Sequence, residues 1–154
     1  MFKFLSATLL SISLSTAAFA YDATKAKESE KFFSHMTQKA CTDSKLFIDA
    51  KKVMEKIREG DNYLLLDVRT KGEASVVSIS DKNSVHIELM HLFEKKNLDT
   101  LPTDKPIIIV CHSGSRATMA AITLKQIGFK NVHILKGGLV ALSEADTTKN
   151  APLR

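Results

Sequence analysis

The sequence lacks features that would mark several large classes of protein. After residue 20 no segment approaches the run of about 18 apolar residues that a membrane-spanning helix needs. There are no internal repeats and no low-complexity tract. The five histidines show no His-x-x-x-His spacing and no accompanying pair of cysteines, so a metal site is not expected. The lysines are spread along the chain rather than blocked together, which favours a solvated surface over nucleic-acid binding.

The start of the chain does carry a clear pattern, that of an export signal. Residues 1–20 contain one basic residue, Lys3, then an apolar stretch without acidic residues, and they end in Ala18-Phe19-Ala20. This is the layout of a cleavable secretory signal peptide. No cysteine follows directly, which favours ordinary cleavage after Ala20 over a lipid anchor. We therefore expect a soluble periplasmic or secreted protein that begins near Tyr21.

The chain that remains after this cleavage has the size of one domain. It would contain 134 of the 154 residues, enough to bury a substantial core. Without Lys3 the formal net charge falls from +5 to +4. This mildly basic balance would help to attract small anionic substrates.

Apolar patterning and turn residues predict alternating strands and helices. The predicted strands are residues 46–48, 63–68, 84–88, 107–110 and 132–135. The predicted helices are residues 22–40, 49–60, 88–96, 116–127 and 137–145, and residues 72–83 are left unassigned. Continuous apolar strands such as 63–68 are typical of a parallel sheet that is buried on both faces. The pattern predicts an α/β sandwich around a mainly parallel sheet, preceded by an extra N-terminal helix.

The chain contains two cysteines, Cys41 and Cys111. An even count in an exported protein is compatible with a disulfide, but a chain of this size folds without one. Cys111 directly follows the predicted strand 107–110, and ligands of parallel sheets gather at the carboxyl ends of the strands. We therefore expect Cys111 to be a free, reactive thiol rather than half of a structural Cys41–Cys111 bond.

The residues after Cys111 are suited to activating a thiol. The loop reads Cys111-His112-Ser113-Gly114-Ser115-Arg116. Gly114 permits a positive φ, so the loop can curl with several backbone N–H groups pointing inward. The next helix begins with its positive dipole end beside the thiol, and Arg116 adds a permanent positive charge. These features favour the thiolate, which is the nucleophilic form of cysteine.

This loop resembles the active-site loop of the rhodanese (thiosulfate sulfurtransferase) family. Residues 64–69, LLLDVR, resemble the second strand of that family and the turn after it, and residues 136–142, KGGLVAL, resemble its closing segment. The resemblance implies a rhodanese-like three-layer sandwich with a five-stranded sheet flanked by helices. We expect this domain to span residues 44–146, after a helical extension at 21–43 and before a C-terminal tail at 147–154.

The resemblance also implies a two-step sulfur transfer that needs neither a metal nor an organic cofactor. Cys111 would attack the outer sulfur of thiosulfate or polysulfide and then pass the sulfur from its persulfide to cyanide, a thiol or a partner protein. The N–H groups of residues 112–116 and the hydroxyls of Ser113 and Ser115 would stabilise the persulfide. Arg116 would bind the anionic donor or shape the loop.

Other positions carry weaker expectations from the same resemblance. Asp67 and Arg69 lie at the end of the predicted strand 63–68, and in the family these positions chiefly support the architecture near the active site. Glu73 resembles an acidic position of the family in the next turn. The usual Gly-His-Ile segment of the family is not visible in residues 73–85, and Leu142 stands where an aromatic residue is common.

Several alternatives remain open at this point. Related phosphatases and arsenate reductases have five residues between the cysteine and the arginine, whereas this loop has four, which favours sulfur transfer. In its expected export and its N-terminal extension the protein resembles the periplasmic polysulfide-sulfur transferases. Those proteins are dimeric, so the resemblance implies a homodimer. A rhodanese-fold module that carries a persulfide to a partner without turnover is one rival. A redox protein that uses Cys41 together with Cys111 is another.

Overall fold

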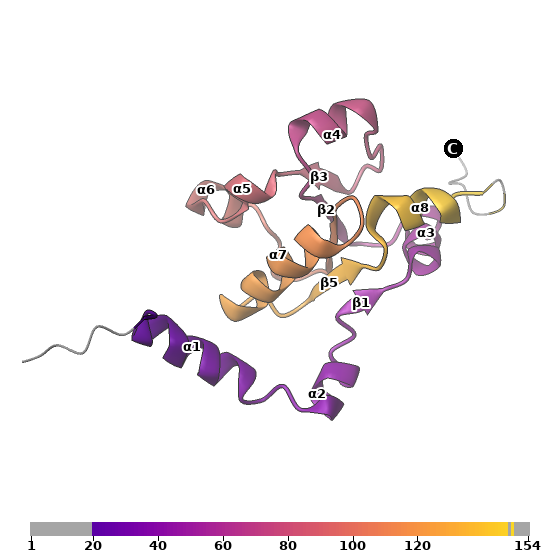
Figure 1. The fold of residues 1–154 in the computed structure, drawn as a ribbon. Helices are drawn as coiled ribbons and strands as arrows, with labels where there is room; N and C mark the ends of the chain where they lie inside the picture. The colour runs from indigo at the N-terminus through magenta and orange to yellow at the C-terminus, as the bar shows by residue number, and fades with distance from the viewer. Residues whose placement is uncertain (1–19, 148, 150–154) are drawn as a thin grey trace, which may run out of the picture.

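A five-stranded parallel sheet forms the centre of the protein (Figure 1). The structure is a computed structural model that describes residues 20–147 and 149. The expected signal peptide, apart from Ala20, and most of the expected tail 147–154 lie outside the described residues. The strands are β1 (Phe47–Ile48), β2 (Leu64–Asp67), β3 (Ser84–His86), β4 (Ile107–Val110) and β5 (Val132–Leu135), in the spatial order β1-β5-β4-β2-β3. This architecture confirms the predicted parallel α/β sandwich.

Helices cover both faces of the sheet, because its central strands are apolar on both sides. Leu64 and Leu66 of β2 face one core, and Leu65 between them faces the other, as expected from the alternation of side chains along a strand. The first core is covered by α5 (Leu89–Leu92) and α7 (Ser115–Gln126). The second is covered by α3 (Ala50–Glu59) and α8 (Gly138–Ala145). The three layers are therefore helices, sheet and helices.

The register of the strands places the predicted site residues at one edge of the sheet. Asp67, the last residue of β2, pairs with Val110, the last residue of β4, and the Val68 N–H donates to the Val110 carbonyl at 2.9 Å. Cys111 follows at once. The turn after β2 and the loop after β4 consequently lie side by side at the carboxyl ends of the strands.

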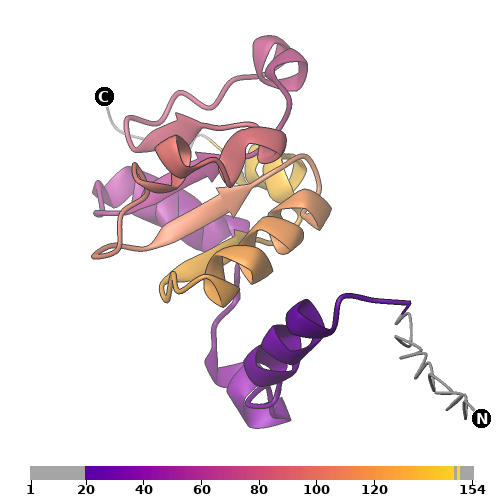
Figure 2. The same ribbon diagram turned by 90° about the vertical axis from the view of Figure 1, so that its left-hand side faces the viewer.

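The predicted helix 22–40 is wrong as a single element. It is two helices, α1 (Ala23–Phe33) and α2 (Gln38–Asp43). Thr37 has an extended backbone, and its hydroxyl accepts the Ala40 N–H at 3.1 Å, so it caps a second helix instead of continuing the first. Figures 1 and 2 show both helices outside the three layers, and neither contains a buried residue.

Two other segments also differ from the sequence prediction. The unassigned residues 72–83 contain a helix, α4 (Lys71–Val76). The predicted helix 88–96 is divided into α5 and α6 (Lys95–Leu98), because Glu94 between them has an extended backbone and is the N-cap of α6. In the part of the chain that the structure describes, no helix has both the length and the apolar character needed to cross a membrane.

Candidate active site

The loop that joins β4 to α7 forms a tight turn around the thiol of Cys111. Cys111 is only 1% exposed, directly after the buried strand β4. Gly114 has a φ of 114°, a conformation that side-chain-bearing residues rarely adopt, and this turns the chain into α7. The Gly114 N–H thereby points back and donates to Cys111 Sγ at 3.1 Å. The thiol thus lies against the positive N-terminal end of a twelve-residue helix.

Helix α8 holds this loop from the other side. The Leu139 N–H donates to the Cys111 carbonyl at 2.8 Å, and the Val140 N–H donates to the His112 carbonyl at 3.3 Å. A Cβ atom added to Gly138 would lie 2.5 Å from the Cys111 carbonyl oxygen. Only glycine therefore allows the backbone of α8 to lie this close to the backbone of the loop. Two carbonyls of the loop therefore face α8 while the Gly114 N–H faces the thiol.

The other predicted loop residues lie around this turn. His112, Ser113 and Ser115 are exposed, whereas Gly114 and Arg116 are half-buried. The structure therefore brings the predicted residues 111–116 into one small loop at the surface, with the cysteine as its buried member.

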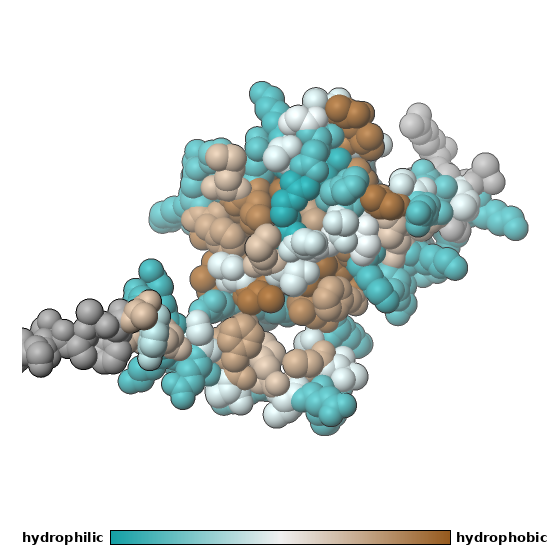
Figure 3. Space-filling view, viewed as in Figure 1, coloured by the Kyte–Doolittle hydropathy of each residue, from teal (hydrophilic) through white to brown (hydrophobic). Residues whose placement is uncertain are grey.

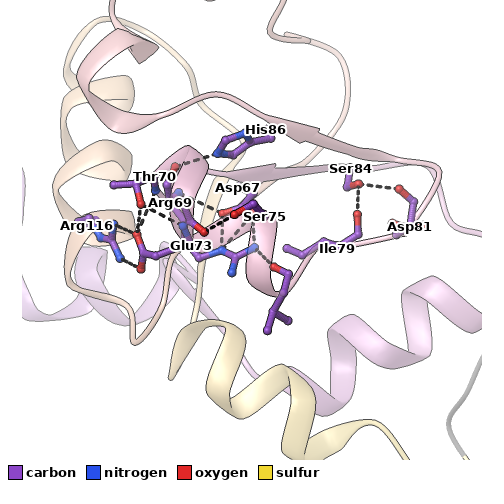
Figure 4. Close-up of polar contacts among 12 residues, drawn as sticks. Asp67, Arg69, Thr70, Glu73, Ser75, Ile79, Asp81, Ser84, His86 and Arg116 are labelled. Atoms are coloured by element: carbon purple, nitrogen blue, oxygen red, sulfur yellow. Dashed lines mark hydrogen bonds and ion pairs between the residues drawn. The ribbon is translucent and has the colours of Figure 1, made fainter.

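Arg116 forms a two-pronged ion pair with Glu73 of α4. Its Nη1 and Nη2 donate to Glu73 Oε2 and Oε1, both at 2.6 Å (Figure 4). The hydrogen bonds from Arg116 hold the pKa of the Glu73 carboxyl well below its usual range. The same hydrogen bonds raise the pKa of Arg116, and the nearby Cys111 makes a smaller contribution in the same direction. The charged forms of both partners are therefore favoured.

Glu73 is the site residue that the sequence prediction treated most weakly, although the sequence contained a signal for it. Thr70 and Glu73 form a capping box: the Glu73 N–H donates to Thr70 Oγ1 at 3.2 Å, and the Thr70 N–H donates to Glu73 Oε2 at 3.0 Å. The motif Thr-x-x-Glu predicts a helix start at this position. The capping box positions the carboxylate, and the loop arginine then binds it.

Asp67 and Arg69 form a separate, buried ion pair beneath α4. Arg69 Nη2 lies 2.7 Å from Asp67 Oδ2, and both side chains are almost fully buried. Arg69 also donates to the Val77 carbonyl at 2.8 Å, and the His86 ring shares a hydrogen bond with the Arg69 carbonyl (Figure 4). These contacts join β2, β3 and the segment after α4. These contacts hold the backbone next to the active-site loop in place, which is a structural role.

The two cysteines lie in different settings. Both are free thiols, and Cys41 is exposed on α2, where its Sγ lies 3.9 Å from the Met36 carbonyl oxygen. Among the described residues, no three histidine, cysteine or acidic side chains are grouped so that they could hold a metal ion.

The fold and the site together define a class: α/β proteins with a buried cysteine at the start of a strand-to-helix loop. Comparison with family models gives the particular family, because the model of the rhodanese-like domain matches residues 49–145. The chain belongs to this family.

Relatives that are named as sulfurtransferases or sulfur carriers agree with this family. The chain is 29% identical over 94 residues, 61% of its length, to a sulfurtransferase of Allochromatium vinosum, covering 84% of that protein. It is 32% identical over 103 residues, 67% of its length, to the putative sulfurtransferase YtwF of Bacillus subtilis, covering 95% of that protein. It is 34% identical over 98 residues, 64% of its length, to the putative sulfur carrier protein YrkF of the same bacterium, of which it spans only half.

A solved structure shows the same fold. The crystal structure of a rhodanese-related protein from Thermoplasma volcanium matches with a TM-score of 0.54 and 33% identity, covering 64% of this chain and 90% of that one. Taken with the sulfurtransferase relatives, the family membership supports sulfur transfer as the general activity of the protein.

Proposed function

We propose that the protein is an exported sulfurtransferase that moves sulfane sulfur through a persulfide on Cys111. The donor is thiosulfate or polysulfide, and the acceptor is a thiol, cyanide or a partner protein. The observation that carries the proposal is the hydrogen bond from the Gly114 N–H to Cys111 Sγ, at the start of α7. A thiol in this position has a hydrogen-bond donor and a positive helix end beside the sulfur that must carry negative charge.

The transfer balances without an added oxidant or reductant. The Cys111 thiolate attacks the outer sulfur of thiosulfate, the S–S bond of the donor breaks, and sulfite leaves with its electron pair. The product is a Cys111 persulfide whose terminal sulfur carries the negative charge. The backbone N–H groups of the loop would stabilise that charge, as in other sites where anions meet backbone donors. Attack by the acceptor on the terminal sulfur then restores the thiolate.

The first experiment is the intact mass of the mature protein after brief exposure to thiosulfate or polysulfide. We expect the wild type to gain the mass of one sulfur atom and to lose it again on addition of cyanide, while Cys111→Ser gains none. The matched control is Cys41→Ser, which removes the other free thiol and should behave as the wild type does. Loss of sulfur loading in Cys41→Ser would instead support a redox pair of cysteines. Absence of loading in the wild type with every donor would refute the proposal.

A persulfide carrier that does not turn over is the second candidate, favoured by the likeness to YrkF, which is named a putative sulfur carrier. Steady-state formation of thiocyanate separates the two functions. An enzyme turns over many times on at least one donor, whereas a carrier accepts one sulfur and releases it only to its partner. Stoichiometric loading without turnover would therefore select the carrier.

Export is part of the proposal and has its own test. The basic start, apolar stretch and Ala-x-Ala ending of residues 1–20 support it. Expression of the full chain in a bacterial host should yield periplasmic protein whose N-terminal sequence starts at Tyr21. An intact N-terminus in the cytoplasmic fraction would contradict it.

A further inference from the structure

The cation of the active-site loop is paired with a carboxylate. Both terminal nitrogens of Arg116 are engaged by Glu73, at 2.6 Å each. The carboxylate is in turn fixed by the backbone N–H and the hydroxyl of Thr70, at 3.0 and 2.9 Å. The Glu73 carboxylate is therefore held in place by both Thr70 and Arg116, and the net charge of the Arg116–Glu73 pair is zero.

Exposed apolar side chains lie next to each partner of this pair. Val76 follows Glu73 by one turn of α4 and is 83% exposed, and Met119 follows Arg116 by one turn of α7 and is 56% exposed. Met90 of α5, at the same edge of the sheet, is 76% exposed. Figure 3 shows hydrophobic residues over α4 and over α5 and α6, on either side of a hydrophilic centre. Methionine side chains adapt to apolar ligands of varied shape.

We propose that Glu73 sets the donor specificity of the enzyme, so that a persulfide on a carbon-bearing thiol, R–S–SH, is preferred over thiosulfate. The proposal rests on the sulfur transfer through Cys111 proposed above. Glu73 is a positioning residue, because it acts through Arg116, and Val76, Met90 and Met119 would contact the organic group of the donor.

The charges of the two donors explain the preference. Thiosulfate is a dianion, and it would approach a thiolate, an arginine and a carboxylate whose charges sum to one negative. An organic persulfide carries at most one negative charge, so it meets less repulsion. In its reaction the Cys111 thiolate attacks the outer sulfur of R–S–SH, the S–S bond breaks, and R–S⁻ leaves with the electron pair. The proton stays on the transferred sulfur, so atoms and charge balance.

The main test is Glu73→Gln, assayed with thiosulfate and with freshly prepared propyl persulfide. Glutamine also forms a capping box, so α4 should persist in the variant. Removing the carboxylate charge leaves the positive charge of Arg116 uncompensated. We expect kcat/KM for thiosulfate to rise about tenfold, mainly through KM, while the value for propyl persulfide changes by less than about twofold. Glu94→Gln is the matched control, because Glu94 bonds to Lys96 and His91 instead of the loop.

A second variant tests the apolar contact. Val76→Thr keeps the shape of the side chain but makes it polar, and it should lower kcat/KM for propyl persulfide about fourfold, the worth of one buried methylene, without changing thiosulfate turnover. The specificity proposal is overturned if the wild type prefers thiosulfate, or if Glu73→Gln changes both donors by the same factor, as a merely structural residue would. Failure of the wild type to take sulfur from thiosulfate, polysulfide or propyl persulfide would instead refute the proposed function.

Discussion

The close packing of α8 on the active-site loop makes Gly138 the most sensitive backbone position in this site. In Gly138→Ala the new methyl carbon would lie 2.5 Å from the Cys111 carbonyl oxygen and 2.6 Å from the His112 carbonyl oxygen. Both neighbours are backbone atoms, so no flexible side chain can move out of the way. The loop or α8 must shift by at least about 0.5 Å to bring this distance to 3.0 Å, below which Cβ contacts are essentially never found.

The expected cost of this substitution has two parts. Gly138 has a φ of 62°, and a residue with a Cβ pays about 1–2 kcal/mol to adopt a left-handed conformation. Overpacking against the two carbonyls adds about 1–3 kcal/mol, so the free energy of unfolding should fall by about 2–5 kcal/mol. A 1 Å misplacement in an active site costs on the order of 100-fold in rate, and a shift of half that size should therefore lower kcat/KM about tenfold.

Gly60→Ala is the matched control, because Gly60 has a similar φ of 71° but nothing within 4 Å of the added carbon. It should lose only the conformational cost of about 1–2 kcal/mol and keep full sulfurtransferase activity. Urea unfolding and thiocyanate formation measure the two quantities. The reasoning is refuted if Gly138→Ala and Gly60→Ala lose equal stability and both remain fully active.

The remaining predictions concern other buried or paired groups. Asp67→Asn should lower the free energy of unfolding by about 3–5 kcal/mol in urea titrations, because it leaves the buried Arg69 charge without its partner; a loss below 1 kcal/mol would show that the pair is not a brace. Tyr63→Phe removes a hydrogen bond of 2.5 Å to the Asp81 carboxylate and should cost about 1.5–3 kcal/mol, while donor preference stays unchanged. The pKa of Glu73 is lowered in the folded protein, so its contribution to stability is present above the ordinary range of glutamate and is lost as the pH falls through the folded value. The difference in unfolding free energy between the wild type and Glu73→Gln should therefore stay constant from about pH 8 to 5 and change only in stronger acid; a change that begins near pH 6 would contradict the assignment.

The fold was predictable from the sequence because its signals are local. Burial on both faces makes β2 and β4 continuous apolar runs, and alternation of strands with amphipathic helices indicates a parallel sheet. The loop at 111–116 could be predicted equally well, since Gly114 and the position of the loop between an apolar strand and a helix can be read from the amino-acid sequence. The break at Ser34–Thr37 was missed because an apolar stripe at helical spacing outweighed the capping signal of Thr37.

Only the tertiary structure decided the contacts between segments that are distant in the chain. Glu73 and Arg116 are 43 positions apart, and they meet because β2 and β4 are neighbours in the sheet and end at the same level. Gly138 touches the Cys111 carbonyl because β5 lies beside β4 and leads α8 back over the loop. By itself the sequence determined the strands, the helices α3, α7 and α8, and the cysteine with its loop, since these depend on local backbone preferences and on the period of the apolar residues. The charge and packing around that loop depend on strand order and register, which arise only when the whole sheet assembles.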